Sequence, residues 1–119
     1  MMLSGAELAD VGFLGSLPEW ARDALARDAT RVHFAAGDYV ARQHEKADAA
    51  HFLTDGSVQV FLRFEGTGDL LIERLTESRP TLGWSVFRPP YRYTASIRAE
   101  TACSAVSIPR RSFQELFDS

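Results

Sequence analysis

The segment from residue 82 to 96 holds the residue types that could bind a charged ligand. It interrupts a series of short strand-like runs with one glycine, two prolines, four aromatic residues and two arginines. When Gly83 opens a single helical turn, backbone amides can approach an anion closely, and the dipole of the turn favours negative charge. An arginine a few residues later, Arg88 or Arg92, can neutralise that charge. The segment is therefore typical of a phosphate-binding cradle.

The same segment is equally compatible with a structural role. Its aromatic side chains can close the open end of a β-barrel while the arginines point into water. Those aromatic residues are Trp84, Phe87, Tyr91 and Tyr93. From the residues alone, both interpretations stay open.

No catalytic or metal-binding pattern accompanies this segment in the sequence. His33, His44 and His51 do not have the spacing of paired metal ligands, and the sequence lacks a nucleophile elbow, a P-loop and a dinucleotide fingerprint. His33 and His51 fall in strand-like runs and are expected to be half-buried and hydrogen-bonded. Cys103 lies in an apolar run and is expected to be a buried, inert thiol. We therefore expect a protein that is not an enzyme and has no metal or resident cofactor, with a small anion as the ligand to consider.

The composition narrows the class of protein further. The 119 residues and 13.2 kDa fit one globular domain. A net charge of −3 argues against binding to nucleic acid or to an anionic membrane surface, because both need a basic field. No run approaches the roughly 18 apolar residues of a membrane span. With a single cysteine, the sequence predicts a cytoplasmic protein.

Two helical regions are predicted before the first strand. A short helix is expected over residues 5–12, and the pattern Ser16-Leu17-Pro18-Glu19 has the form of a capping box that begins a second helix. Apolar residues then recur at helical spacing. They are Leu17, Trp20, Ala21, Ala24 and Leu25. This face predicts that Trp20 anchors the core.

The middle of the chain consists of short strand-like runs separated by turn signals. They cover residues 30–34, 39–42, 50–53, 57–64, 70–75, 94–99 and 102–108. The turn at 65–69 predicts a hairpin, and the last two runs are predicted to pair with each other as well. Pro109 then opens a final helix, in which Phe113, Leu116 and Phe117 should pack back on the sheets. This order predicts a mainly β fold, an antiparallel sandwich or jelly-roll barrel with helices at both ends.

Several short motifs, in this order and at this spacing, resemble the cyclic nucleotide-binding domain of the catabolite activator and FNR-like regulators. They are Phe13-Leu14-Gly15-Ser16-Leu17-Pro18, residues 34–40, residues 48–53 with 56–60, residues 97–101 and residues 108–113. The resemblance implies a double-stranded β-helix, a jelly-roll β-roll flanked by short N- and C-terminal helices. It implies helices over 1–29, the roll over 30–108 with a cassette at 83–94, and the start of a C-terminal helix over 109–119.

In that family the cassette consists of a glycine, a glutamate that holds the ribose 2′-hydroxyl, a helical turn, and an arginine followed by serine or threonine that grip the cyclic phosphate. Gly83 and Thr94 match, but Trp84 stands at the glutamate position and Tyr93 at the arginine position, with Arg92 one residue early. A lost charge-assisted bond costs about 1.5–3 kcal/mol, or one to two decades of affinity. The resemblance therefore implies weak or absent binding of cyclic AMP.

On an extended segment, an arginine displaced by one residue would point to the opposite face. A turn at the two prolines could restore its aim, so Arg92 is the first phosphate-binding candidate and Arg88 the second. The full set of ligand-binding candidates is Gly83, Trp84, Ser85, Arg88, Arg92, Tyr93, Thr94, Val60 and Leu75. Two hypotheses remain. One is a remodelled site for a cyclic nucleotide or another small anionic ligand, and the other is a scaffold for protein contact in which Trp84 fills the ribose space.

The resemblance also bears on partners. Regulators of this family continue into a dimerisation helix and a helix-turn-helix, whereas this chain stops at Ser119. The sequence therefore predicts a stand-alone regulatory module that binds neither nucleic acid nor membrane by itself. Its output would require a protein partner or a homodimer.

Overall fold

The computed structural model describes residues 3–66, 68–76, 81–82 and 84–118, and these form short helices around two β-sheets. The helices are α1 (Gly5–Leu8), η1 (Gly12–Ser16), α2 (Glu19–Ala26), η2 (Trp84–Phe87) and α3 (Arg110–Phe117), of which η1 and η2 are 3-10 turns. The strands are β1 (Thr30–Phe34), β2 (Tyr39–Ala41), β3 (Ala49–Asp55), β4 (Val58–Phe64), β5 (Gly68–Leu75), β6 (Thr81–Leu82), β7 (Ser96–Ala99) and β8 (Cys103–Pro109). The predicted strand-rich architecture with helices at both ends is confirmed.

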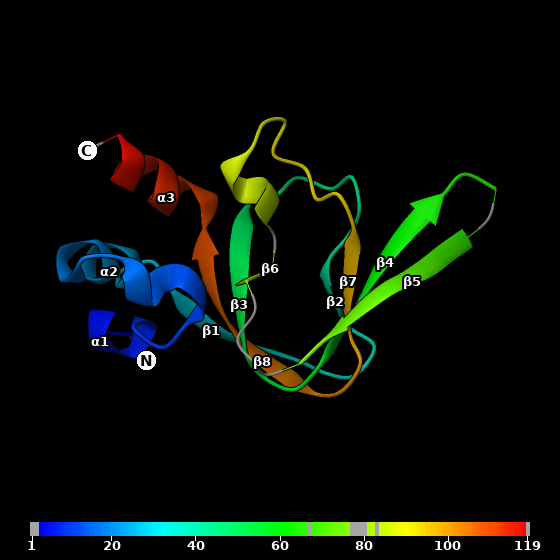
Figure 1. Cartoon of the computed structure of the whole chain (residues 1–119), viewed down its shortest axis with the longest axis horizontal. Coiled ribbons are helices and arrows are strands. Elements are labelled where there is room, and N and C mark those ends of the chain that lie inside the picture. Colours follow the sequence, from blue (N-terminus) through cyan, green and yellow to red (C-terminus); the bar gives the residue numbers. More distant parts are fainter. Residues whose placement is uncertain (1–2, 67, 77–80, 83, 119) are drawn as a thin grey trace.

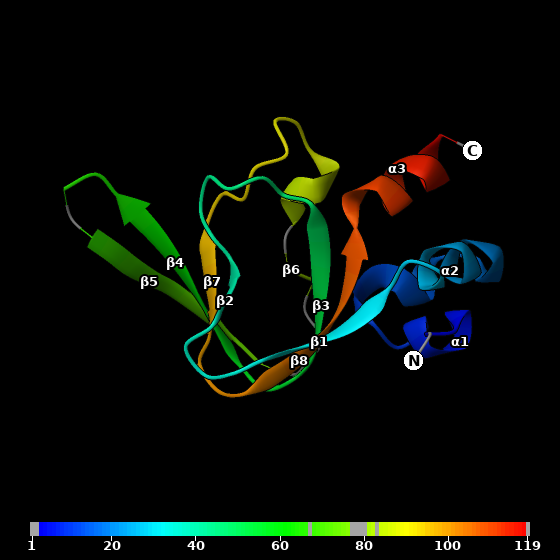
Figure 2. The ribbon, with the colours of Figure 1, turned by 180° about the vertical axis from the view of Figure 1, so that it is seen from behind.

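The strands form two antiparallel sheets, with the orders β1-β8-β3-β6 and β2-β7-β4-β5. Figures 1 and 2 show the two sheets as the arms of a roll, with the three α-helices gathered beside the first sheet. Strands that follow one another in the chain mostly lie in different sheets, as in the pairs β1 and β2, β3 and β4, and β7 and β8. The chain therefore passes from one sheet to the other at almost every turn. This is the jelly-roll arrangement that the sequence predicted.

One predicted hairpin is confirmed and the other is wrong. Strands β4 and β5 pair from Val58 opposite Leu75 to Phe64 opposite Gly68. Strand β7 instead pairs with β2 and β4, while β8 pairs with β1 and β3. The backbone amides of Glu100 and Thr101 both donate to the carbonyl oxygen of Ser57, at 2.9 and 3.4 Å, so the turn after β7 is bound to the start of β4 and does not close a hairpin.

The capping box lies at a different helix from the predicted one. Ser4 and Glu7 cap α1 reciprocally, since the amide of each donates to the side chain of the other at 3.2 Å. The Ser16 hydroxyl instead donates to the carbonyl oxygen of Phe13 at 2.6 Å, inside η1, and Pro18 is the N-cap of α2 without a side-chain bond. The capping prediction for residues 16–19 is therefore wrong, although a helix does begin at Glu19.

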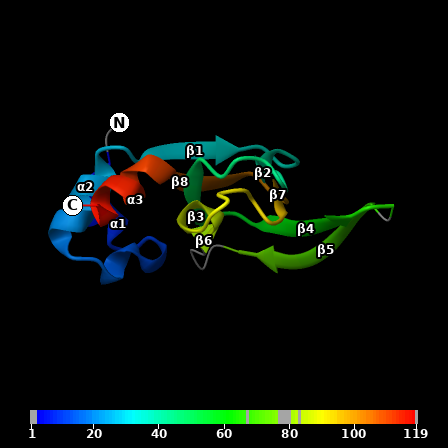
Figure 3. The ribbon, with the colours of Figure 1, turned by 90° about the horizontal axis from the view of Figure 1, so that it is seen from above.

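Trp20 is not the core anchor that its spacing predicted. Its side chain is 62% exposed, whereas Ala21 and Leu25 on the same helix are buried. The helix α2 packs between α1 and α3, and Figure 3 shows these helices together at one end of the molecule. Ala21, Leu25 and Ala26 of α2 are therefore the residues buried in the helix contact, and the indole in its first turn is left at the surface.

Aromatic rings connect the helices to the first sheet and to η2. The ring of Phe13 lies 5.8 Å from that of Phe52 on β3 and 5.9 Å from that of Phe87 on η2. Phe87 in turn lies 4.9 Å from Phe113 on α3. As predicted, Phe113 is buried, whereas Phe117 is 64% exposed. The turn that opens the cassette is thus packed against both ends of the chain.

No helix of the described residues has the length and apolar character needed to cross a membrane.

Gly56 should be the most sensitive glycine of the two sheets. It has φ +83°, and a Cβ there would lie 2.6 Å from the carbonyl oxygen of Ala102 and would collide with the side chain of Cys103. We expect Gly56→Ala to cost about 3 kcal/mol, from strain at positive φ together with overpacking. Gly37 has φ +93° with nothing within 4 Å of an added Cβ, so Gly37→Ala should cost only about 1 kcal/mol. Urea unfolding of both variants checks this, and equal losses would contradict it.

Candidate functional site

The predicted cassette runs from the end of β6 through η2 to the start of β7. Gly83 and the side chain of Trp84 lie outside the described residues. Ser85 is half-buried, whereas Arg88 and Thr94 are exposed. The turn η2 occupies the place where the sequence predicted a single helical turn.

The end of the cassette is bound to the loop between β2 and β3. The amide of His44 donates to the carbonyl oxygen of Tyr93 at 2.8 Å. The amide of Tyr93 donates to the carbonyl oxygen of Glu45 at 2.9 Å. The amide of Ala47 donates to the carbonyl oxygen of Tyr91 at 2.7 Å. Residues 91–93 and 44–47 therefore form a short antiparallel bridge, in which Lys46 lies opposite Arg92. The two segments run side by side in Figures 1 and 2.

This bridge sets the directions of Arg92 and Tyr93. Tyr93 is only 8% exposed, and its hydroxyl donates to the carbonyl oxygen of Ala49 at 2.8 Å. Burial raises the pKa of this phenol, so it stays a neutral donor. Arg92 is exposed, and its Nη1 donates to the carbonyl oxygen of His44 at 3.0 Å. Neighbours on an extended segment take opposite faces, and here the tyrosine takes the inner face and the arginine the outer one.

Val60 and Leu75 lie on the second sheet, away from the cassette in sequence. Both are half-buried and pack against the hydrophobic core. Leu75 pairs with Val58, and Val60 lies between Glu73 and Ile97 in the sheet register. Their positions are those of core residues.

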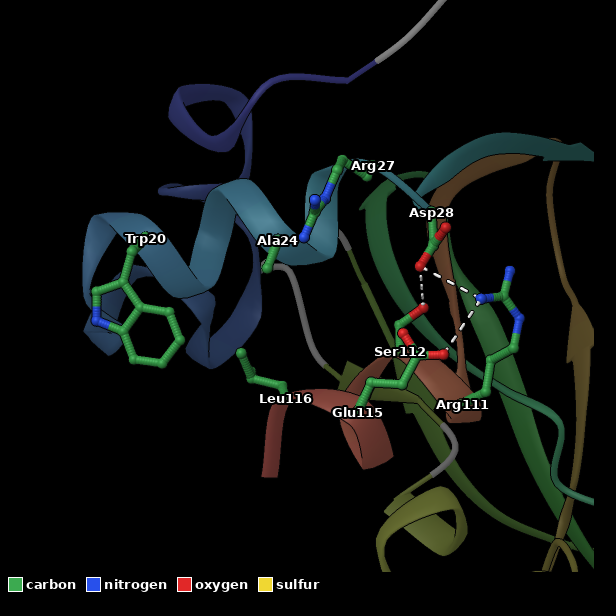
Figure 4. Close-up of a pocket in the computed structure, with 8 residues that line it drawn as sticks. All are labelled: Trp20, Ala24, Arg27, Asp28, Arg111, Ser112, Glu115 and Leu116. Atoms are coloured by element: carbon green, nitrogen blue, oxygen red, sulfur yellow. Dashed lines mark hydrogen bonds and ion pairs between the residues drawn. The ribbon is translucent and has the colours of Figure 1, made fainter. Parts of the chain in front are cut away.

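A hollow with a volume of about 570 Å³ lies between α2 and α3. Figure 4 shows Trp20 and Leu116 toward one end and a polar group toward the other. In that group the Ser112 hydroxyl donates to Asp28 at 2.7 Å, and Arg111 lies 3.5 Å from the same carboxylate. The hollow thus has an apolar end at Trp20 and Leu116 and a polar end where these side chains bind one another.

Two further hollows lie around the loop that follows β2. One, of about 470 Å³, is lined by Tyr39, Arg42, Gln43, His44, Glu45, Arg63, Glu65 and Ser96. The other, of about 340 Å³, is lined by Tyr39, Val40, Ala41, Arg42, Glu45, Lys46, Asp48 and Tyr93. Tyr93 is the one predicted site residue among these linings. Sequence reasoning missed this loop, because nothing in its own residues signals that it pairs with residues 91–93.

Two guanidinium groups of the cassette have no acidic partner among the residues that the structure describes. The ion pairs of the described residues involve Arg31, Arg63, Arg74 and Arg111. Arg88 and Arg92 are both exposed and take part in none of these pairs. Together with Lys46 opposite Arg92, they place positive charge at the surface of the cassette.

The histidines differ from the sequence prediction. His33 is hydrogen-bonded as predicted, with Nδ1 2.7 Å from the Ser104 hydroxyl, but it is exposed. His51 is buried, and its Nδ1 has no hydrogen-bond partner in the described chain, so the prediction of a half-buried, bonded side chain is wrong for it. Its ring meets that of Phe34 edge-on, and burial lowers its pKa to about 4. Within the described residues, no three acidic, histidine or cysteine side chains gather as a metal site.

Comparison with known proteins identifies the family. The profile of the cyclic nucleotide-binding domain matches residues 31–119, and the chain therefore belongs to that family. A search of curated proteins gives no significant match.

Solved structures agree in fold over nearly the whole chain. A candidate cyclic nucleotide binding protein from Ruegeria pomeroyi is 28% identical with a TM-score of 0.83, covering 97% of this chain and 50% of its own. A similar protein from Geobacter metallireducens is 24% identical with a TM-score of 0.84. The match covers 97% of this chain and 82% of the Geobacter chain. A third structure is the regulatory subunit of a cAMP-independent protein kinase A from Trypanosoma cruzi, bound to guanosine. It is 25% identical with a TM-score of 0.80, and the match covers 91% of this chain and 38% of the trypanosome chain. This chain thus spans half or less of the Ruegeria and trypanosome chains.

Tyr93 should contribute to stability through its hydroxyl. We expect Tyr93→Phe to lose about 1–2 kcal/mol, because the carbonyl oxygen of Ala49 loses its donor in a partly buried place. Tyr39 offers a matched control, since its half-exposed ring lies under Arg42 and its hydroxyl forms no side-chain bond recorded among the described residues. Tyr39→Phe should change the free energy of unfolding by less than about 0.5 kcal/mol. Chemical denaturation of the two variants measures the difference, and a neutral Tyr93→Phe would rule out the anchoring role.

His51 should make the fold sensitive to acid. Because its pKa is about 4 in the folded protein and 6.5 as a free group, the unfolded chain binds the proton first, so stability falls as the pH drops from about 6.5 to about 4. At pH 4.5 this loss amounts to about 2–3 kcal/mol. Between pH 7 and pH 4.5, the free energy of unfolding of His51→Leu should fall by about 2–3 kcal/mol less than that of the native protein. The variant His33→Gln should show the same fall as the native protein. Urea unfolding at both pH values tests this, and an unchanged pH slope in His51→Leu would disprove it.

Proposed function

We propose that this chain is a non-enzymatic regulatory domain that binds a small anionic ligand, nucleotides included, at a remodelled cassette, and that it binds cyclic AMP weakly or not at all. The observation that supports this is the exchange of roles between Tyr93 and Arg92. The residue at the family's phosphate-gripping position is a buried neutral phenol, and the neighbouring guanidinium is at the surface.

The weak binding of cyclic AMP follows from two missing groups. The Tyr93 hydroxyl already donates to Ala49, so it cannot also neutralise a phosphate. Trp84 has no carboxylate with which to hold a ribose hydroxyl. Each lost charge-assisted bond removes about 1.5–3 kcal/mol, and the two together weaken a micromolar site by about two to four decades, to roughly 0.1–10 mM.

The binding of another anion rests on the positive charge that remains. Arg88 and Arg92 are exposed and have no carboxylate partner in the described chain, and Lys46 lies opposite Arg92. A planar guanidinium suits phosphate and carboxylate oxygens. The trypanosome structure that is similar to this chain is bound to guanosine. Guanosine is a neutral nucleoside, so this supports a nucleoside as one part of the ligand, whereas the arginines would bind a phosphate attached to it.

A second candidate function is a ligand-free scaffold for protein contact. The backbone and side-chain bonds that tie residues 91–93 to the loop after β2 favour it, because they make this part of the cassette a structural element. In either case the signal would pass to a protein partner or to a second copy of the chain.

Calorimetric titration with inorganic phosphate, AMP and cyclic AMP distinguishes these functions. We expect binding of AMP or phosphate, and a Kd for cyclic AMP above about 0.1 mM. Arg92→Ala should weaken anion binding about ten- to hundredfold, since a charge-assisted bond is lost. Its melting temperature should fall by no more than about 6 °C, because only one surface hydrogen bond to His44 disappears. Arg88→Ala should show a smaller loss of affinity.

Arg27 provides the control for charge. It is an exposed arginine at the end of α2 and has no ion pair among the described residues, so Arg27→Ala should bind as the native protein does. Micromolar binding of cyclic AMP would refute the remodelled cassette. If none of the three probes binds, the ligand-free scaffold is the function that remains. If Arg92→Ala unfolds, the role of Arg92 is structural and not ligand-binding. Hydrolysis of cyclic AMP would overturn the non-enzymatic assignment.

A further inference from the structure

Two basic residues lie directly opposite one another where the cassette runs beside the loop after β2 (Figures 1 and 2). Lys46 and Arg92 are the partners of an antiparallel bridge. Backbone hydrogen bonds of 2.9 and 2.7 Å flank this pair on its two sides, so the pair occupies a non-hydrogen-bonded position of the ladder. At such a position the Cα atoms are about 4.5 Å apart and the side chains approach most closely. The bridge therefore holds two like charges close together.

Both side chains point away from the protein. The residues next to them along the two segments, Ala47 and Tyr93, are 0% and 8% exposed and so mark the inner face of the bridge. Side chains alternate along an extended segment, and opposite residues share a face. Lys46 and Arg92 therefore share the outer face, where both are exposed.

The positive charges of this pair are not neutralised by the residues that the structure describes. The recorded ion pairs include neither Lys46 nor Arg92. Glu45 is the backbone partner of Tyr93 and belongs to the inner face. The pKa of Tyr93 is raised by burial and further by the charges of Asp48 and Glu45, so both carboxylates act on that inner side. Because like charges directly opposite one another destabilise a strand pair, a bound anion would relieve a repulsion here.

The pair also has hydrogen-bond donors to offer. Arg92 uses one of its five N–H groups on the carbonyl oxygen of His44, at 3.0 Å, which fixes the guanidinium at the outer face. Its other donors, and the ammonium of Lys46, have no recorded partner in the described part of the chain. The donors belong to two segments that the backbone already holds in place, so little further ordering is needed to bind an anion between them.

We propose that Lys46 and Arg92 bind a terminal phosphate between them, on the outer face of the cassette, and that this site selects phosphomonoesters over cyclic diesters. A phosphomonoester carries nearly two negative charges at neutral pH, whereas a cyclic diester has a single ionised oxygen. Two adjacent cations are therefore neutralised by the monoester and only half neutralised by the diester. This inference rests on the proposed function, to which it adds Lys46 and the chemical class of the ligand.

A hollow beside the pair has room for the rest of the ligand. Its volume is about 340 Å³, and its lining includes Lys46, Arg42, Glu45 and Asp48. Sites for small molecules begin at about 300 Å³. The carboxylates of Glu45 and Asp48 repel a phosphate but accept hydrogen bonds from hydroxyl groups. The ligand that fits is therefore a small phosphomonoester that carries hydroxyl groups, with its phosphate at the outer pair.

The like-charge pair predicts an effect in the protein without any ligand. Lys46→Gln should raise the melting temperature by about 1–4 °C at low salt, because the repulsion of Arg92 is removed. The gain should shrink at about 1 M salt, where the Debye length falls to about 3 Å. Arg27→Gln is the control, since this exposed arginine at the end of α2 lies opposite no cation of the described chain and should show no such gain. An unchanged melting temperature of Lys46→Gln at low salt would overturn the side-by-side placement.

Calorimetric titration at about pH 8 tests the ligand class. The probes are AMP and adenosine 5′-methylphosphate, a singly charged diester that keeps the base and the ribose. The native chain should bind AMP at least about tenfold more tightly than the methyl ester, since one charge-assisted bond is at stake. Lys46→Gln should weaken AMP binding about ten- to hundredfold and bring the two probes within about threefold of each other.

Three further variants complete the test. Lys46→Arg should keep most of the affinity for AMP because it keeps the charge, and Arg27→Gln should bind as the native chain does. Lys46→Met keeps the aliphatic stem and replaces Lys46→Gln should that variant not fold, which circular dichroism shows. AMP binding that is unchanged in Lys46→Gln, or equal affinity of the native chain for both probes, would overturn this site and leave the proposed function in place. If neither probe binds, this site and the proposed function both fail.

Discussion

The backbone hydrogen bonds between residues 91–93 and 44–47 decide which cassette side chains face the protein and which face water. Once the amide and carbonyl of Tyr93 are paired with Glu45 and His44, the alternation of an extended segment sends neighbouring side chains to opposite sides. Tyr93 then reaches Ala49, and Arg92 stays at the surface. The chemistry available to a ligand thus depends on pairing with a loop about 45 residues earlier in the chain.

The cassette is also connected to both ends of the chain through one aromatic ring. Phe87, in the turn that opens the cassette, contacts Phe13 before the first strand and Phe113 after the last. A rearrangement of this turn would therefore change the packing of η1 and α3 together, because closely packed rings cannot move independently.

Much of the fold could be predicted because strand and turn signals are local. The hairpin of β4 and β5 was predictable from the turn at 65–69, and so was a closing helix after Pro109. The predicted pairing of the last two strands failed because each finds its partners far away in the chain: β7 pairs with β2 and β4, and β8 with β1 and β3. The prediction that Trp20 is a core residue was wrong for a similar reason. Spacing shows which residues share a face of a helix, but not which part of that face a neighbouring helix covers.

For the candidate site, the sequence by itself determined the residue types: a tyrosine and a tryptophan stand where the family has an arginine and a glutamate, and two arginines lie nearby. It also determined the fold class, since the periods of strands and the positions of turns are written in neighbouring residues. Only the tertiary structure decided that Arg92 faces outward, that His51 is buried with an unbonded nitrogen, and that Lys46 lies opposite Arg92. Those outcomes depend on contacts between segments far apart in the chain, and no local pattern encodes such contacts.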